Sequence, residues 1–292
     1  MRKMNSETPQ LNTPTEMHHL FLSCLVQQAE TQADIKAVWL EGSFGRGNAD
    51  RYADVDAHLL IAENRLDTFR DSAETWLSGV APLVLFSFMF QRQMINALTQ
   101  DGLRVDLWLH AGDSIAVSKG RVRTLLNRHG CLQIQPREKA AQQPADVAET
   151  LLRHIGEFWR CVAITPTVMG RNELVTGFMG INVLLMSLTE VLIIANRTPR
   201  DRGVKNLNQF LPADARREIE KALIVPALTP ENLAKAVLRL AGIMQQQGPA
   251  TAEAFGIAYP HDLEKAVIRY VSNELRLLGL ESVLEKLHRR FD

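Results

Sequence analysis

Two apolar runs separated by a glycine-rich segment constrain this chain more than any other feature. The runs are residues 35–40 and 53–61, and the segment Gly-Ser-Phe-Gly-Arg-Gly occupies residues 42–47 between them. Short apolar runs bounded by glycines predict two strands joined by a turn-rich loop. The second run carries Asp54 and Asp56 at its entrance. Because alternate residues of a strand point to the same face, both carboxylates are expected on one face of a sheet.

Two neighbouring carboxylates beside a glycine loop favour a site for a divalent cation and an anion. Mg²⁺ binds one or two carboxylates and completes its coordination with water and phosphate oxygens. Glycines let backbone N–H groups approach an anion closely, and Ser43 adds a hydroxyl where a helix could begin. A solvated turn is the alternative interpretation. However, Asp56 stands inside an otherwise apolar run, where an unpaired buried carboxylate would be costly. The stretch therefore predicts a site for a triphosphate and its metal.

A third carboxylate stands in a later apolar run. Residues 103–109 carry Asp106 at their centre, and Asp101-Gly102 separates them from the apolar run 94–99. Asp-Gly between two apolar runs predicts a β-hairpin, which places Asp106 in the middle of a strand. It can join the first two carboxylates only if its strand lies beside theirs, and the sequence alone leaves that open.

These residues together resemble the signature of a known family. Gly42-Ser43, ten intervening residues and then Asp54-Val55-Asp56 resemble the G-S-x10-D-x-D signature of the polymerase-β-like nucleotidyltransferases. The chain is most similar to the small bacterial antibiotic (aminoglycoside and lincosamide) nucleotidyltransferases. In that family a third acid lies between apolar residues on a later strand, as Asp106 does. The resemblance covers roughly residues 30 to 130. It implies an α+β fold, with an N-terminal mixed sheet covered by helices on one face and a C-terminal all-α bundle.

The resemblance also implies a role for each residue of the site. The three aspartates would hold two Mg²⁺ ions against ATP or another nucleoside triphosphate. Asp106 would be either the third metal ligand or the general base that takes the acceptor's proton. Gly42 and Ser43 would bind the phosphates. Arg46 is either a further phosphate contact or a solvated loop charge.

The second half of the chain supplies further candidates. Glu173, at the start of a predicted helix, is a candidate general base, although an acid there is usually explained by the helix dipole alone. Residues 197–205 form a basic loop, from which Arg202 or Lys205 could reach the triphosphate. A solvated loop between helices is the alternative for this basic segment.

The helical and strand patterns divide the chain into four parts. We expect a loose tail over 1–15, a nucleotidyltransferase domain over 16–132, a linker over 133–144 and a helical substrate and closure domain over 145–292. Residues 83–90 predict a buried strand, and residues 121–126 a last strand. The expected helices cover residues 16–31, 66–76, 145–162, 173–195, 214–223, 231–244 and 261–287.

Composition narrows the class of protein. Lys plus Arg and Asp plus Glu number 33 each, so no overall field recruits nucleic acid or an anionic membrane. Three scattered cysteines without a C-x-x-C pattern indicate reduced thiols rather than disulfides or zinc. The first ten residues are polar and show no secretory signal, and the apolar stretch 181–195 is too short to span a bilayer. We expect a soluble, cytoplasmic protein.

The leading functional hypothesis is transfer of a nucleotide, AMP from ATP, to a hydroxyl of a small molecule such as an antibiotic. The partners would be the triphosphate and the acceptor, and a homodimer is possible. The basic loop favours an acceptor less cationic than an aminoglycoside. One alternative is nucleotidylation of a partner protein, as in minimal nucleotidyltransferase antitoxins. Another is a non-catalytic nucleotide sensor, which the intact set of three acids disfavours.

Overall fold

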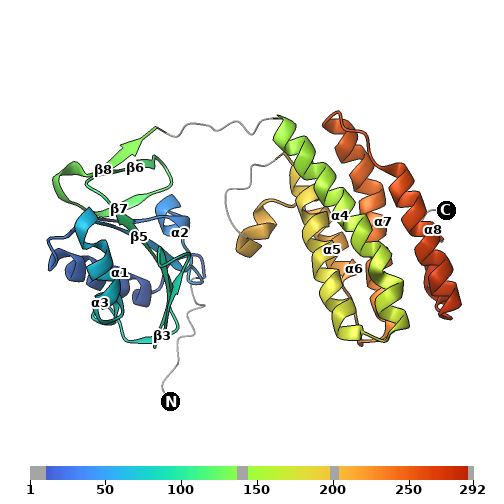
Figure 1. Ribbon diagram of the computed structural model, residues 1–292, viewed down its shortest axis with the longest axis horizontal. Coiled ribbons are helices and arrows are strands. Elements are labelled where there is room, and N and C mark those ends of the chain that lie inside the picture. The colour runs from blue at the N-terminus through green and yellow to red at the C-terminus, as the bar shows by residue number, and fades with distance from the viewer. Residues whose placement is uncertain (1–10, 137–143, 198–203, 289–292) are drawn as a thin grey trace, which may run out of the picture. The chain divides into compact units, whose positions relative to one another are not determined.

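The computed structural model describes residues 11–136, 144–197 and 204–288, and the chain divides into two units, Met1–Ala140 and Ala141–Asp292 (Figure 1). The first unit combines a mixed sheet with helices and the second is helical, which confirms the predicted α+β class. The helices of the first unit are α1 (Glu16–Glu30), α2 (Gly42–Arg46) and α3 (Leu66–Ser78), with 3-10 turns at Glu63–Arg65 and Arg128–Gly130. Its strands are β1 (Ile35–Leu40), β2 (Val55–Ile61), β3 (Leu83–Met89), β4 (Met94–Thr99), β5 (Arg104–Ala111), β6 (Ile115–Ser118), β7 (Arg123–Asn127) and β8 (Leu132–Gln135).

The main sheet is mixed because one central pair of strands is parallel. Within the described part of this unit, six strands follow the order β3-β4-β5-β2-β1-β7. Strands β2 and β5 pair in parallel, and the other neighbours pair antiparallel. Strands β4 and β5 form the hairpin that Asp101-Gly102 predicted. Strands β6 and β8 form a separate parallel pair.

The two faces of the main sheet are covered differently. On one face, alternate apolar residues of β2 and β5, such as Val55 and Leu107, pack with buried residues of α1 and α3, such as Leu25 and Leu77. The opposite face carries Asp56 and Asp106, because these residues alternate with the buried ones along their strands. Part of this second face, around Trp39 and Leu60, packs with Cys131 and Leu132 near β8.

Several local predictions for this unit were wrong. The run 83–90 was expected to be a buried strand, but β3 is an edge strand, and Val84 is 63% exposed. The last strand of the main sheet begins at Arg123 rather than at residue 121. Strand β8 extends into the expected linker 133–144, of which residues 137–143 lie outside the described part. In α1 the apolar residue Leu20 lies on the exposed side of the helix.

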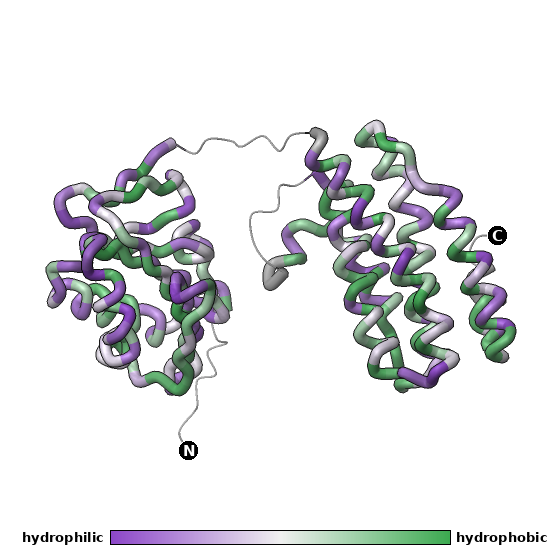
Figure 2. The backbone as a smooth tube through the Cα atoms, viewed as in Figure 1, coloured by the Kyte–Doolittle hydropathy of each residue, from purple (hydrophilic) through white to green (hydrophobic). Residues whose placement is uncertain are grey.

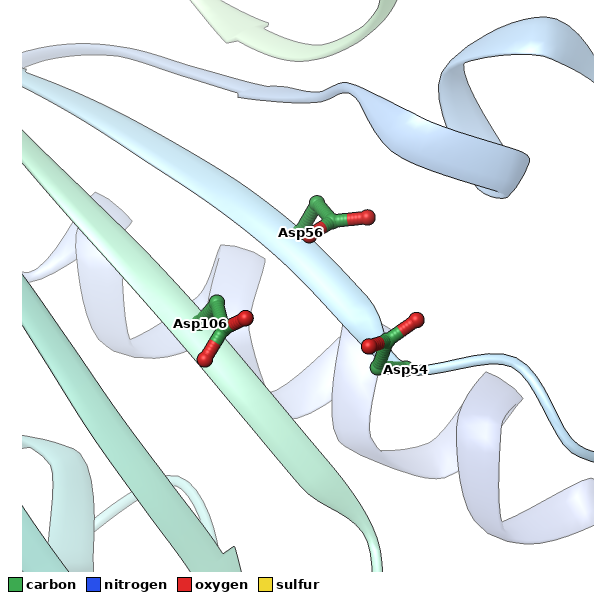
Figure 3. Close-up of side chains that lie close together, drawn as sticks. All are labelled: Asp54, Asp56 and Asp106. Carbon is green, nitrogen blue, oxygen red and sulfur yellow. The ribbon is translucent and has the colours of Figure 1, made fainter. Parts of the chain in front are cut away.

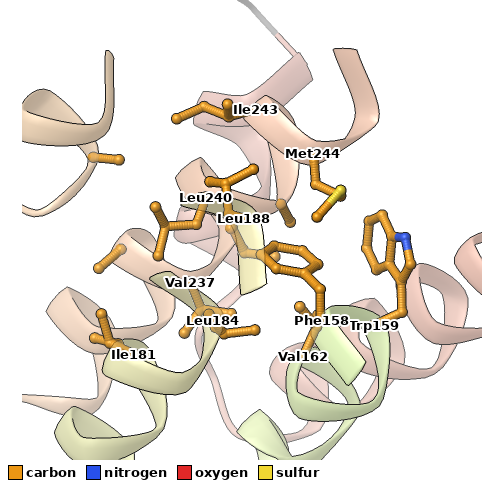
Figure 4. Packing of buried hydrophobic residues seen from close by; sticks show 14 of the residues in the cluster. Phe158, Trp159, Val162, Ile181, Leu184, Leu188, Val237, Leu240, Ile243 and Met244 are labelled. Atoms are coloured by element: carbon orange, nitrogen blue, oxygen red, sulfur yellow. The ribbon is translucent and has the colours of Figure 1, made fainter. Parts of the chain in front are cut away.

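The second unit is built around a continuous apolar core (Figure 4). Its largest fully buried side chains are Phe158 and Trp159, which α4 contributes. In Figure 2 green and purple alternate along these helices, as expected for helices that each bury one face. The elements are α4 (Pro144–Gly170), α5 (Leu174–Ala195), a 3-10 turn at Val204–Gln209, α6 (Ala213–Ala222), α7 (Pro230–Ala254), α8 (His261–Leu277) and α9 (Glu281–His288).

The helix boundaries depart from the sequence prediction at prolines and at one glycine. Helices α4 and α7 each continue past a proline, Pro166 and Pro249, beyond the expected ends at residues 162 and 244. The single helix expected over 261–287 is broken between α8 and α9. Gly279 has a φ of 71° there, in the left-handed region that favours glycine and ends helices.

Helix α5 is longer than the apolar stretch 181–195, which was expected to be too short to span a bilayer. It runs for 22 residues, close to the helix expected over 173–195, so the apolar stretch 181–195 is only part of a longer helix. Of the described helices, only α5 is long and apolar enough to cross a membrane, a test that core helices of soluble proteins also pass. Its apolar character has a local explanation, because α5 packs against α4 and α7 and buries Ile181, Leu184 and Leu188 in the shared core.

Candidate functional site

Three carboxylates from separate parts of the sequence meet at one point of the sheet (Figure 3). Asp54 immediately precedes β2, Asp56 lies in β2, and Asp106 lies directly opposite Asp56 in the parallel register with β5. One oxygen atom from each carboxylate lies within 4.8 Å of the other two, and all three residues are half-buried. The adjacency of the two strands, which the sequence left open, is therefore confirmed.

The donor set suits a hard divalent cation. Three carboxylates this close repel one another unless positive charge lies between them. Carboxylate oxygens are the ligands that Mg²⁺ prefers, and half-buried side chains leave room for water or phosphate in the remaining positions. No other group of three or more His, Cys, Asp or Glu side chains in the described residues has this spacing. The triad, defined as Asp54, Asp56 and Asp106, is thus the candidate metal site.

The glycine loop packs directly against the triad. Gly42 has a φ of 56°, and a Cβ atom added there would lie 1.7 Å from Oδ2 of Asp56. A side chain at this position would therefore displace the carboxylate. The backbone N–H of Glu41 donates to the carbonyl of Asp56 at 2.9 Å, which fixes the start of β2 against the loop. Gly45 is constrained too, because its Cβ would lie 2.2 Å from the carbonyl oxygen of Arg121.

Ser43 presents a hydroxyl that lacks a partner. Its Oγ is buried and has no hydrogen-bond partner among the described residues. A buried polar atom left unpaired costs stability, so such atoms in native proteins call for an explanation. A phosphate oxygen of a bound nucleotide would satisfy this hydroxyl. Arg46, the other predicted phosphate contact, is half-buried at the end of α2.

His18, which no sequence pattern singled out, holds the loop that leads to Asp54. This side chain of α1 is only 1% exposed. The backbone N–H of Thr15 donates to Nδ1 of His18, so the ring proton is on Nε2, which donates to the carbonyl of Ala53 at 3.0 Å. The same ring lies 5.5 Å from the ring of Phe44 in α2. His18 therefore contacts both loops of the site, and nothing in the helical spacing distinguishes it from a core residue.

Asn96 is a second residue that the sequence analysis missed. It lies in β4 opposite Asp106, and its Nδ2 donates to Oδ1 of Asp106 at 2.6 Å. On the other side of this carboxylate stands Asp56. The available sequence signal was a lone asparagine in an apolar strand, where this residue type is uncommon.

A row of rings lies beside the triad on the same face of the sheet. Phe90, Trp108, His58 and Trp39 stack in this order with interplanar angles of 10°, 11° and 19°. Nδ1 of His58 and Nε2 of His110 lie 3.0 Å apart, at hydrogen-bond distance. Burial lowers the pKa of His58 to about 3, with a smaller contribution from His110, and burial also lowers the pKa of His110. This wall of the site is therefore uncharged at neutral pH.

The remaining predicted site residues belong to the second unit. Glu173 is the N-cap residue of α5 and is exposed. Lys205 lies in the 3-10 turn Val204–Gln209, and its side chain is outside the described part of the structure, as are residues 198–203, including Arg202. The roles of these residues stay predictions.

Comparisons with known proteins identify the family. A family model described as "Streptomycin adenylyltransferase" matches residues 12–274. No curated protein matches the chain. Among solved structures, an aminoglycoside 6-adenyltransferase from Bacillus subtilis is 13% identical, with 87% of this chain and 97% of that chain covered and a TM-score of 0.41.

Two further solved structures are 12% identical, each with a TM-score of 0.31. One is a STING-associated CdnE c-di-GMP synthase from Capnocytophaga granulosa, with 80% of this chain and 81% of that chain covered. The other is the CD-NTase CdnG of Bradyrhizobium diazoefficiens in complex with GTP, with 92% and 96% covered. Since the family model spans most of the 292 residues, the chain belongs to the streptomycin adenylyltransferase family, within the polymerase-β-like nucleotidyltransferase superfamily.

Proposed function

We propose that this nucleotidyltransferase moves AMP from ATP to a hydroxyl group of a small-molecule antibiotic. The observation that carries the proposal is that Asp56 lies opposite Asp106 in two neighbouring parallel strands. Together with Asp54 they bring three carboxylate oxygens within 4.8 Å of one another. The family description supports an aminoglycoside acceptor, so streptomycin is the first compound to test and a lincosamide the second. ATP is the expected donor in the cytoplasm.

The triad would hold two Mg²⁺ ions. Asp54, Asp56 and Asp106 would supply the carboxylate oxygens that bind them. When bound, Mg²⁺ would supply the positive charge that neutralises the triphosphate and the departing pyrophosphate. The unpaired Ser43 hydroxyl and the backbone of the Gly42 loop would donate hydrogen bonds to phosphate oxygens, with Arg46 and Lys205 as further cationic contacts.

The transfer itself is an in-line displacement. The acceptor's hydroxyl oxygen forms a bond to the α-phosphorus of ATP, and the bond from that phosphorus to the bridging oxygen breaks to release pyrophosphate. The hydroxyl proton passes to a carboxylate, for which Asp106 and Glu173 are the two candidates. The helical unit, which carries Glu173, would bind the acceptor. The row of rings beside the triad would exclude water from one side of the reacting groups.

A transfer assay tests the proposal. The protein is incubated with ATP labelled on the α-phosphate, Mg²⁺ and a panel that includes streptomycin, a lincosamide and a cell lysate. Label on an antibiotic supports the proposal. Label on a protein of the lysate alone would instead support nucleotidylation of a partner, and ATP binding without any transfer would support a nucleotide sensor.

Matched variants assign the proton acceptor. Asp106→Asn and Glu173→Gln are compared with Asp101→Asn, an exposed aspartate in the turn of the same β4–β5 hairpin. Loss of transfer in one of the first two variants, with the metal still bound, identifies the base. Equal activity in all three variants would remove both candidates.

A further inference from the structure

Asn96 is hydrogen-bonded to Asp106 of the triad. Its Nδ2 lies 2.6 Å from Oδ1 of Asp106, and the two residues are directly opposite in the antiparallel register of β4 and β5. Only the amide N–H₂ end of Asn96 can make this bond, because an ionised carboxylate accepts hydrogen bonds and donates none. A hydrogen bond to a charged acceptor is shorter and stronger than one between neutral groups, which agrees with this distance.

The pairing of β4 with β5 does not require this side-chain bond. The two strands are already joined by a backbone ladder that runs from Met94 opposite Trp108 to Leu98 opposite Arg104. Asparagine is also depleted in strands, and the neighbours of Asn96 on both sides are apolar. An apolar residue would fit the pattern of β4 better, so the contact with Asp106 is the feature that accounts for an amide here.

The contact restricts how Asp106 can act. The amide binds Oδ1 and restricts the rotation of the carboxylate about its Cβ–Cγ bond, so Oδ2 is the oxygen that Asn96 does not contact. Hydrogen-bonded partners behind a metal ligand orient it, and their removal weakens metal binding by about tenfold to a hundredfold.

We propose that Asn96 is a positioning residue of the metal site, which holds Asp106 so that a single oxygen is presented to the cation. This inference rests on the proposed function, because it assumes that the triad binds a divalent cation. Asn96 acts through Asp106 and touches neither the substrates nor the metal. Its loss therefore raises the concentration of metal that the enzyme needs, and a high concentration of metal restores the activity.

The experiment measures Mn²⁺ binding by electron paramagnetic resonance, without nucleotide, in the wild-type protein and in Asn96→Ala and Asn96→Leu. Leucine keeps a side chain of similar size without a donor, so it guards against a packing defect in the alanine variant. Ser87→Ala is the matched control, since Ser87 lies opposite Asn96 in the edge strand β3, on the side of β4 away from β5. We expect the Mn²⁺ dissociation constant to rise about tenfold in both Asn96 variants and to be unchanged in the control.

A second measurement excludes a purely structural effect. The rate of AMP transfer is followed as Mg²⁺ is raised, and thermal melts confirm that each variant is folded. A rate that recovers at high Mg²⁺ supports the inference, while a rate that stays low at every Mg²⁺ concentration overturns it. If both Asn96 variants bind Mn²⁺ as tightly as the wild-type protein, the role of Asn96 is overturned and the proposed metal site still stands. If the wild-type protein itself binds no Mn²⁺, both the proposed metal site and the role of Asn96 are overturned.

Discussion

The two units of this protein use buried side chains in opposite ways. The helical unit fills its core with apolar residues such as Phe158 and Leu188, which contribute to it by packing. The sheet unit places half-buried carboxylates near the starts of strands β2 and β5, where apolar residues would give more stability. A site of this kind costs stability and is kept for chemistry. Substitutions in the triad should therefore affect activity alone, and substitutions in the helical core should affect stability alone.

The largest effect is expected for Asp56→Asn. The change removes one charge from the metal site and keeps the shape of the side chain, so transfer should fall on the order of a thousandfold or more. The thermal midpoint should change little, because the substitution keeps the shape of a half-buried side chain outside the apolar core. Initial rates and calorimetry check the two expectations. Activity within a fewfold of wild type would show that Asp56 is not a metal ligand.

The opposite pattern is expected for Phe158→Ala in the helical core. Phe158 is fully buried, so its truncation should lower the free energy of unfolding by about 3–5 kcal/mol. Mn²⁺ binding to the triad, measured while the protein is folded, should not change. Val175→Ala is the control, since Val175 is 68% exposed on α5 and its loss should have no effect on a urea unfolding curve. A loss of Mn²⁺ binding in Phe158→Ala would show that the two units are coupled.

The histidine pair beside the triad should make stability depend on pH. Burial lowers the pKa of His58 from 6.5 to about 3, so the folded state favours the uncharged ring. As pH falls below about 6.5 the unfolded chain binds a proton that the folded chain rejects, so the free energy of unfolding declines until the folded pKa is reached. His58→Gln should give a shallower decline in urea titrations with a chelator present. An equal slope in both proteins would contradict this account.

The smallest effect is expected for His18→Phe. Phenylalanine keeps a ring against Phe44 but removes the hydrogen bond to the carbonyl of Ala53, so stability should fall by about 1–2 kcal/mol. The loop before Asp54 should loosen, and the KM for the metal–ATP complex should rise a fewfold. Leu20→Ala, on the exposed side of the same helix, is the control and should match wild type. An unchanged KM in His18→Phe would limit this residue to a structural role.

The sequence predicted the features that depend on local spacing. The Asp-Gly turn, the two strands around the glycine loop and the pair Asp54 and Asp56 all followed from residues close together in the chain. The pairing of β2 with β5 did not, because a parallel pair joins segments about fifty residues apart and its choice depends on the whole sheet. For the same reason the run 83–90 was expected to be buried, although β3 lies at the edge of the sheet.

Residues that support the site were harder to predict than those that form it. His18 and Asn96 act through single contacts with Ala53 and Asp106, and no sequence period encodes a contact between different elements. Gly279 is a related case, since its left-handed conformation breaks a helix whose apolar pattern continues on both sides. For His18 and Asn96, the positions of the neighbouring elements had to be known before the role of the residue could be assigned.

The most direct test of the central claim is diffraction from crystals grown with Mn²⁺ and an ATP analogue that cannot be cleaved. The account predicts anomalous density bound by one oxygen each from Asp54, Asp56 and Asp106, with phosphate oxygens within hydrogen-bond distance of Ser43. Anomalous density elsewhere, or a nucleotide bound away from these carboxylates, would contradict it.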